Sequence, residues 1–244
     1  MNIVIKILYD GTNYCGWQKQ PDRISIQEVL EKAVLDLTGE VVDVIASGRT
    51  DAGVHALGQV ASFKLKKDFD ISKVLKGLNF YLREDIRVCD ARLVSDDFSA
   101  RFSAIKKTYQ YQIYVSNIDN PLLKNRAVRV QDVDIKALRA KAREFVGEFD
   151  FKRYNSSGGG AKTTVRKMFD ISIDESEYIG ERIIKIELTA NGFLYNMVRK
   201  IVGVLLKKDA EFIKQSIKEP YMMVSEIAPP YGLYLKEVFY EKNN

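Results

Sequence analysis

The sequence predicts an α+β fold of two β-α-β-β-α-β halves, each a ferredoxin-like or RNA-recognition-like plait with an antiparallel sheet. Two observations carry this prediction. Apolar and polar residues follow strand and helix periodicities in the same order of elements in both halves, and no internal sequence repeat accompanies that order. We therefore expect the two sheets to be joined side by side, with the helices on one face. The other face is then free, and many RNA-binding modules use such a face.

The first half is expected to form one domain, residues 1–104. Residues 3–9 are apolar apart from Lys6 and predict a strand. Ser25 and Glu28 have capping-box spacing, so a helix is expected to begin at Ser25, and Gly39 can close it. The other elements of this half are expected at 41–46 and 58–65 (strands), 71–80 (helix) and 86–94 (strand).

The second half is expected to form the other domain, residues 105–244. Residues 107–115 alternate aromatic and polar side chains, which is typical of a strand with one buried face. The remaining elements are expected at 134–146 (helix), 167–174 and 182–189 (strands), 196–208 (helix) and 233–240 (strand). The polar, glycine-rich segment 152–163 predicts a mobile loop or lid.

The composition is that of a globular protein. Of 244 residues, 46% are hydrophobic and 29% are charged, which is far from the composition of a disordered chain. No apolar run approaches the about 20 residues that span a bilayer. The first apolar stretch meets Asp10 too soon for a signal peptide. We expect a cytoplasmic protein without a membrane segment.

The residue counts argue against metal and cofactor chemistry. Cys15 and Cys89 are far apart, and His55 is the single histidine, so a disulfide framework and a histidine- or cysteine-based zinc site are not expected. Carboxylate-bound magnesium stays possible. Ala161 stands before Lys162 where a phosphate-binding loop needs glycine, and no GxGxxG or GxSxG motif is present. We expect no cofactor and no metal.

The net charge fits a polyanionic partner. Lys and Arg total 38 against 33 for Asp and Glu, which gives a net charge of +5 and a pI near 9.0. Cationic side chains bind a phosphate backbone by releasing its counterions. Such a charge is common in unrelated proteins as well, so it supports a nucleic-acid partner without identifying one.

Residues 47–59, SGRTDAGVHALGQ, are the segment most suggestive of chemistry. Glycines bracket small and polar residues between two expected strands, so the backbone can approach a ligand closely. Arg49 and Asp51 are two residues apart and point the same way in an extended loop. For a bare arginine–aspartate pair, an ion-paired turn is the favoured interpretation.

The segment GRTDAGVHA resembles the active-site signature of the TruA family of tRNA pseudouridine synthases, and the resemblance extends over nearly the full chain. Further motifs occur in the family's order: YDGTNYCGWQ (9–18), SIQEVLEKAV (25–34), FSARFSAIKKTYQY (98–111), NGFLYNMVRKIVG (191–203) and GLYL (232–235). The resemblance implies the pseudouridine synthase fold. It also implies an isomerase (an intramolecular transferase) that converts uridine to pseudouridine at positions 38–40 of tRNA, in the anticodon arm, and that acts as a homodimer.

The resemblance also assigns roles to residues of this chain. Asp51 is the expected nucleophile, Arg199 the guanidinium paired with it, and Tyr109 the ring that stacks on uracil and handles a proton. The expected substrate-binding residues are Arg49, Leu233, Lys107 and His55, and for His55 a structural role in bonding the loop backbone is also expected. Whether Asp51 attacks the uracil ring, attacks C1′ or removes a sugar proton stays open.

Two alternative functions remain at this point. A non-catalytic RNA-binding protein built from two plaits would explain the basic charge and the aromatic strand. It would not explain an acidic side chain in a glycine-rich loop, because a carboxylate that faces phosphates is costly for a pure binder. A pseudouridine synthase that acts on another RNA is the second alternative.

Overall fold

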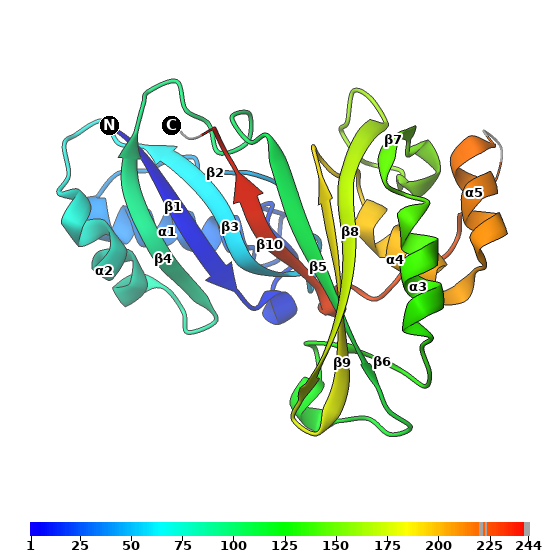
Figure 1. Ribbon diagram of the computed structural model, residues 1–244. Coiled ribbons are helices and arrows are strands. Elements are labelled where there is room, and N and C mark those ends of the chain that lie inside the picture. Colours follow the sequence, from blue (N-terminus) through cyan, green and yellow to red (C-terminus); the bar gives the residue numbers. More distant parts are fainter. Residues whose placement is uncertain (220–221, 223, 242–244) are drawn as a thin grey trace. The chain divides into compact units, whose positions relative to one another are not determined.

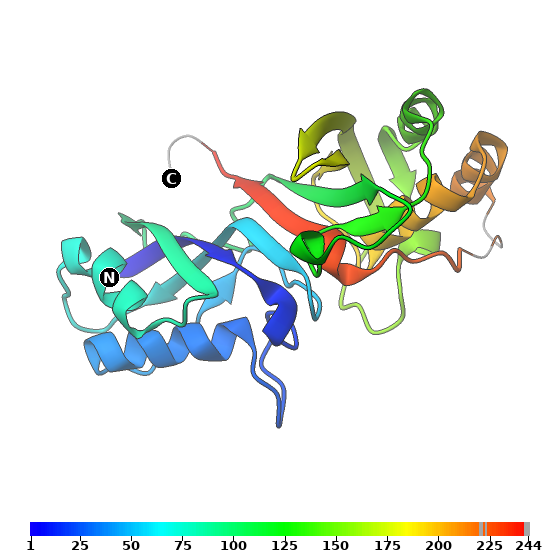
Figure 2. The ribbon, with the colours of Figure 1, turned by 90° about the horizontal axis from the view of Figure 1, so that it is seen from below.

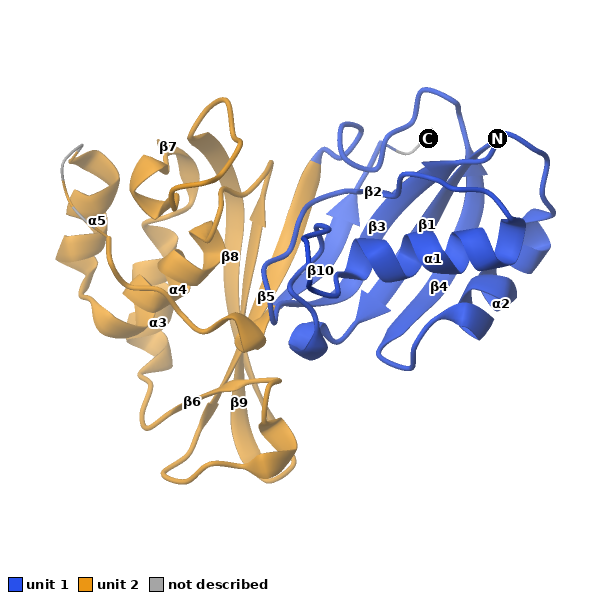
Figure 3. Cartoon of the chain, turned by 180° about the vertical axis from the view of Figure 1, so that it is seen from behind, with its two compact units in different colours: residues 1–105, 234–244 blue, residues 106–233 orange. Residues whose placement is uncertain are grey.

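The computed structural model describes residues 1–219, 222 and 224–241 of the chain (Figure 1). The chain packs into two compact units: unit 1 is Met1–Ile105 with Tyr234–Asn244, and unit 2 is Lys106–Leu233 (Figure 3). The expected domains 1–104 and 105–244 stay a prediction, and the described residues 234–241 belong to unit 1. The mixture of helices and sheet strands confirms the α+β class.

Unit 1 is a sheet, antiparallel except at β10, with two helices on one face. Strands β4 (Ile86–Val94), β1 (Asn2–Tyr9) and β3 (His55–Lys64) lie in that order, and β10 (Leu233–Phe239) runs parallel to the start of β3. Helices α1 (Ile26–Thr38) and α2 (Ile71–Tyr81) cover one face, as the view from below shows for α1 (Figure 2). Ile3, Ile5 and Ile7 alternate along β1 and are fully buried.

The predicted caps of α1 are both present. The Ser25 hydroxyl accepts a hydrogen bond from the N–H of Glu28 at 3.2 Å, which satisfies one free donor of the first turn. Gly39 ends the helix with φ of 75°, a left-handed conformation that glycine adopts without strain. The sequence therefore defines this helix through its ends as well as its apolar stripe.

The predicted strand at 41–46 is wrong in its length, because β2 contains only Ile45–Ala46. The preceding residues bond to side chains of α1 instead. Val44 donates its N–H to Glu31 at 3.1 Å, and the carboxylate of Asp43 accepts a hydrogen bond from Gln27 at 3.2 Å. Strand β3, predicted at 58–65, begins three residues earlier at His55, immediately after the turn at residues 51–54.

Unit 2 has the sheet order β5-β9-β8-β7, and β6 pairs in parallel with β5. Helix α3 packs against β8, and α4 buries most of its side chains. Strands β6 and β7 and helix α5 were not predicted. The bounds are β5 (Lys106–Val115), β6 (Val128–Val130), α3 (Ile135–Arg143), β7 (Gly147–Asp150), β8 (Val165–Tyr178), β9 (Glu181–Ala190), α4 (Met197–Lys207) and α5 (Ala210–Lys218).

In the part of the chain that the structure describes, none of the helices combines the length and the apolar character that a membrane crossing requires.

Candidate active site

Asp51 lies in a turn whose backbone is held against residues 16 and 17 of unit 1. Asp51 and Gly16 form an isolated antiparallel bridge, and the N–H of Trp17 donates to the carbonyl of Thr50 at 3.0 Å. The N–H of Val54 closes the turn by donating to the Asp51 carbonyl at 3.1 Å. Two motifs far apart in sequence thus fix the backbone that carries the half-buried Asp51.

Gly16 is required for this approach. Its φ is +105°, and a Cβ at this position would lie 2.5 Å from the carbonyl oxygen of Thr50. Any side chain would therefore push the turn away. The family-like motif at 9–18 contributes this close backbone contact to the site.

A buried polar network supports the residues just before Asp51. Gln59, fully buried on β3, accepts a hydrogen bond from the Ser47 hydroxyl at 2.7 Å and donates to the carbonyl of Gly48 at 2.8 Å. The hydroxyls of Tyr9 and Thr50 lie 2.8 Å apart, and the Gln59 amide donates to Tyr9 at 3.4 Å. Gln59 and Tyr9 lie within the motifs at 47–59 and 9–18, but the sequence alone does not distinguish them from core strand residues.

His55 is buried at the start of β3 and connects three segments of unit 1. Its Nδ1 accepts the N–H of Gly11 at 3.0 Å, and its ring stacks on Tyr234 with 4.7 Å between ring centroids. The carboxylate of Asp10 lies 3.1 Å from the same nitrogen, which is an ion pair only when the ring is protonated. Arg49 is exposed on the loop before Asp51.

Arg199 is held on two sides in the first turn of α4. Its Nε donates to the carbonyl of Ala228, and its Nη1 donates to Oδ1 of Asn196, each at 2.8 Å. Two hydrogen bonds from different nitrogens fix the plane of the guanidinium. Arg199 was predicted as a site residue from the sequence and Asn196 was not, although both lie in the motif at 191–203.

Tyr109 and Lys107 lie on β5. Tyr109 pairs with Leu188 of β9, is 8% exposed, and meets Phe193 edge to face with 5.0 Å between ring centroids. Lys107 is half-buried and pairs with Ala190 at the start of the same strand. Phe193 belongs to the motif at 191–203, so this motif supplies both a neighbour of Tyr109 and the arginine.

Tyr111 anchors the segment that precedes Leu233. Its hydroxyl donates to the carbonyl of Pro229 at 2.8 Å, and burial raises the pKa of this phenol well above its usual range. A Cβ on Gly232 would lie 2.8 Å from the Tyr111 ring. The same segment provides the Ala228 carbonyl that binds Arg199, and it ends at Leu233, which is 5% exposed.

The predicted site residues are divided between the two units. Unit 1 contains Arg49, Asp51 and His55, and unit 2 contains Lys107, Tyr109, Arg199 and Leu233. Among the described residues, no group of three or more His, Cys, Asp or Glu side chains could hold a metal ion.

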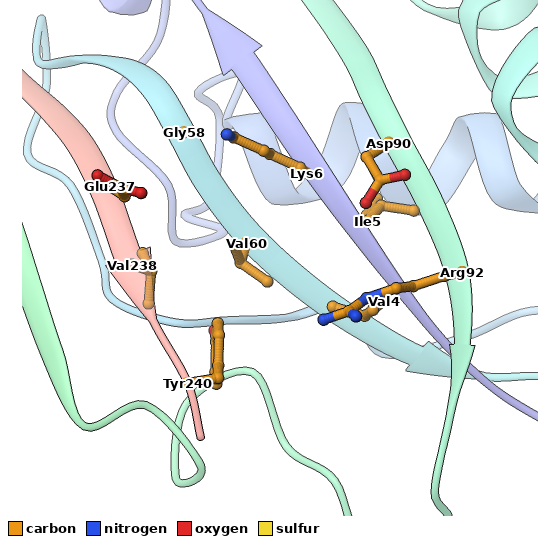
Figure 4. A pocket seen from close by; sticks show the side chains of 10 residues that line it. All are labelled: Val4, Ile5, Lys6, Gly58, Val60, Asp90, Arg92, Glu237, Val238 and Tyr240. Carbon is orange, nitrogen blue, oxygen red and sulfur yellow. The ribbon is translucent and has the colours of Figure 1, made fainter. Parts of the chain in front are cut away.

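A shallow cavity of about 160 Å³ lies elsewhere on unit 1, on the sheet face opposite α1 and α2 (Figure 4). Val4, Val60 and Val238 give it an apolar floor. Its charged side chains are of both signs: Lys6, Arg92, Asp90 and Glu237. None of the predicted site residues lines this cavity.

Comparison with known proteins identifies the family. The pattern of the family described as tRNA pseudouridine synthase matches residues 5–103 and 141–241. The tRNA pseudouridine synthase A of Acetivibrio thermocellus is 42% identical over 246 residues, which cover 98% of this chain and 99% of the relative. That of Caldicellulosiruptor bescii is 43% identical over 248 residues, with the same coverage of both chains.

A solved structure, the crystal structure of a Cbf5-Nop10-Gar1 complex, aligns with 98% of this chain and 60% of its own chain. Its TM-score is 0.38 and its identity 13%, too low for a comparison of sites. The family pattern and the relatives identify the family without this structure. Because the pattern covers most of the sequence and the relatives exceed 40% identity over nearly its full length, the chain belongs to the tRNA pseudouridine synthase family.

Proposed function

We propose that this chain isomerises uridine to pseudouridine in tRNA, with Asp51 as the essential carboxylate. The observation that supports this role most strongly is the turn at residues 50–54, which the Gly16 bridge and the Gln59 network hold in place. A nucleophilic carboxylate must be both ionised and positioned. A fixed turn in a member of this family meets the second condition.

The reaction needs no donor or acceptor of electrons. The N1–C1′ glycosidic bond breaks, the uracil turns, and a C5–C1′ bond forms. The proton on C5 leaves and N1 gains one, so substrate and product have the same atoms and the same oxidation level. The residues of the chain therefore have to orient the base, move a proton and stabilise charge at the broken bond.

The other residues divide these tasks. Arg199 pairs with Asp51 and holds the carboxylate in its charged form, since an adjacent guanidinium favours the anion. Tyr109 stacks on the uracil with a flat ring, a contact worth about 1–3 kcal/mol per base, and Leu233 packs on the base's other face. Arg49, which is exposed on the loop, contacts the RNA around the flipped nucleotide. Lys107 binds the phosphate backbone of the RNA. His55, buried directly after the turn that carries Asp51, has a structural role and accepts the backbone N–H of Gly11.

Asp51→Asn tests the proposal, because the amide keeps the size of the carboxylate but removes its charge. We expect pseudouridine formation to fall below detection, while the dissociation constant for tRNA changes by only a few-fold. Release of tritium from tRNA labelled at C5 of uridine measures the reaction, and filter binding measures affinity. Asp36→Asn is the matched control, since its exposed pair with Lys32 on α1 contributes little to stability.

Retained turnover in Asp51→Asn, with the control unchanged, would remove Asp51 from the mechanism. Chemical mapping of pseudouridine in bulk tRNA and in the remaining cellular RNA, with and without the protein, separates the possible substrates. We propose modification in the anticodon arm at positions 38–40. Pseudouridine in another RNA alone, or in none, would contradict this.

We also propose that the active form is a cytoplasmic homodimer. Sedimentation of the protein with and without tRNA tests the oligomeric state, and a monomer at working concentration in both samples would contradict it.

A further inference from the structure

Asn196 has an unusual conformation for the residue that begins a helix. It stands at the N-cap of α4 with φ of 61° and ψ of 5°, in the left-handed region. Asparagine is favoured at N-caps because its side-chain oxygen accepts a hydrogen bond from the first turn. Here the side chain makes no capping hydrogen bond. A strained residue that gives up its usual stabilising contact points to another role.

The Asn196 amide links two other groups instead. Oδ1 accepts from Nη1 of Arg199 at 2.8 Å, and Nδ2 donates to the hydroxyl of Ser156 at 3.1 Å. The orientation of the amide follows from its partners, because a guanidinium can only donate. The planar amide of Asn196 therefore connects Arg199 to the glycine-rich segment 152–163, which is called the glycine-rich loop below.

The loop itself is docked on the residues just before α4. The N–H of Ser156 donates to the carbonyl of Tyr195 at 3.0 Å. A Cβ on Gly159 would lie 3.1 Å from the Cβ of Tyr195, closer than an ordinary contact, so the segment lies tightly against this residue. Ser156 is therefore fixed by its backbone when it meets Asn196.

We propose that Asn196 is a positioning residue that orients the Arg199 guanidinium and ties it to the glycine-rich loop, so that loop docking sets the rate of isomerisation rather than the affinity for tRNA. The inference rests on the proposed role of Arg199. The Ala228 carbonyl fixes Nε, and Asn196 supplies the second fixed point that defines the plane of the guanidinium. Without the Asn196 hydrogen bond, the Arg199 cation stays in place but the plane of its guanidinium is less well defined.

Asn196→Gly is the central variant, because glycine keeps the left-handed backbone without strain and removes both side-chain hydrogen bonds. We expect the single-turnover rate at saturating enzyme to fall on the order of 10- to 100-fold, with the dissociation constant for tRNA within about threefold. Asn196→Asp keeps an oxygen that accepts from Arg199 and can also accept a hydrogen bond from the Ser156 hydroxyl. Its single-turnover rate should therefore be within a few-fold of that of the unmodified protein. Ser156→Ala, which cuts the loop link alone, should lower the rate less than Asn196→Gly.

A double-mutant cycle separates positioning from a general structural effect. Arg199→Lys removes the planar fork, so adding Asn196→Gly to it should change the rate by less than about twofold. Independent multiplication of the two effects, or a rate for Asn196→Gly within twofold of the unmodified protein, would overturn the inference. Failure of the proposed function is distinguishable, because it would appear as retained activity in Asp51→Asn.

Discussion

Tyr9 supports the turn that carries Asp51 through a buried hydroxyl. The hydroxyl meets Thr50 at 2.8 Å and accepts from the Gln59 amide at 3.4 Å. Burial raises the pKa of Tyr9 from its ordinary 10.0 to about 12, and the hydrogen bonds with Thr50 and Gln59 oppose that shift. The neutral phenol is therefore the form that the folded protein retains.

Tyr9→Phe should make the free energy of unfolding less dependent on pH. Between pH 10 and 12 the unfolded chain releases the Tyr9 proton while the folded protein keeps it, so the unmodified protein loses stability as pH rises through this window. At pH 8 the variant should be less stable by about 1–2 kcal/mol, because a buried hydrogen bond is lost. At pH 11 that difference should shrink by about 1 kcal/mol.

Urea unfolding of both proteins at pH 8 and pH 11 checks this expectation. The other buried tyrosines are common to both proteins, so their titration cancels in the difference. An equal stability difference at the two pH values would contradict the shifted pKa of Tyr9.

The residues expected to do the chemistry were predictable from sequence, but those expected to position them were not. GRTD identified Asp51, and the motif at 191–203 identified Arg199. Gln59 acts on Ser47, twelve residues away, and Asn196 acts on Ser156, forty residues away. Such roles depend on which backbone segments meet in the fold, and a single sequence without its tertiary pairing does not contain that information.

The hairpin between β8 and β9 ends in an unfavourable turn. Tyr178 pairs with Glu181, so the turn consists of Ile179 and Gly180, with φ of 54° and 71°. Both positive values are those of a type I′ turn, for which Asn-Gly is the preferred sequence. A β-branched residue in this region is strained.

Ile179→Asn should therefore stabilise the protein by about 1 kcal/mol, because it removes backbone strain. The Ile179 side chain is 40% exposed, so little packing is lost. The urea midpoint of unfolding measures the gain. Ile179→Val, still β-branched, is the control and should give none. If Ile179→Asn were no more stable than that control, the argument from strain would be contradicted.

Helix ends were easier to predict than strand lengths. The caps of α1 are local, and Ser25 and Gly39 took their expected places. Strand β2 is shorter than predicted because the carboxylate of Glu31 on α1 accepts the hydrogen bond from the N–H of Val44. Helix α5 was missed although Asp209 caps it by accepting from the N–H of Phe212 at 2.8 Å, a signal visible in the sequence. Hydrophobic periodicity does not reveal which backbone N–H groups bond to side chains instead of to a neighbouring strand.

The positive charge of the chain includes a group of cationic side chains on and just after the glycine-rich segment 152–163 of unit 2. The net charge is +5. Lys152, Lys162 and Lys167 are exposed, with Arg153 and Arg166 half-buried among them. Nζ of Lys167 also lies 5.7 Å from the centre of the Phe169 ring, which restricts the side chain without neutralising it. A polyanion that approaches this loop meets several cations within a short stretch of chain.

Replacing Lys162 and Lys167 together with glutamine should reduce the salt dependence of tRNA binding. Each phosphate contact contributes about 0.7–0.9 to the slope of log K against log salt, so the magnitude of the slope should fall by roughly 1.4 to 1.8 if both lysines contact phosphates. Filter binding at a series of salt concentrations measures the slope. The control replaces Lys32 and Lys73, which are exposed on the helices of unit 1, and should leave the slope unchanged. Equal slopes for both pairs would mean that charge acts through the whole molecule, with no local contact at the loop.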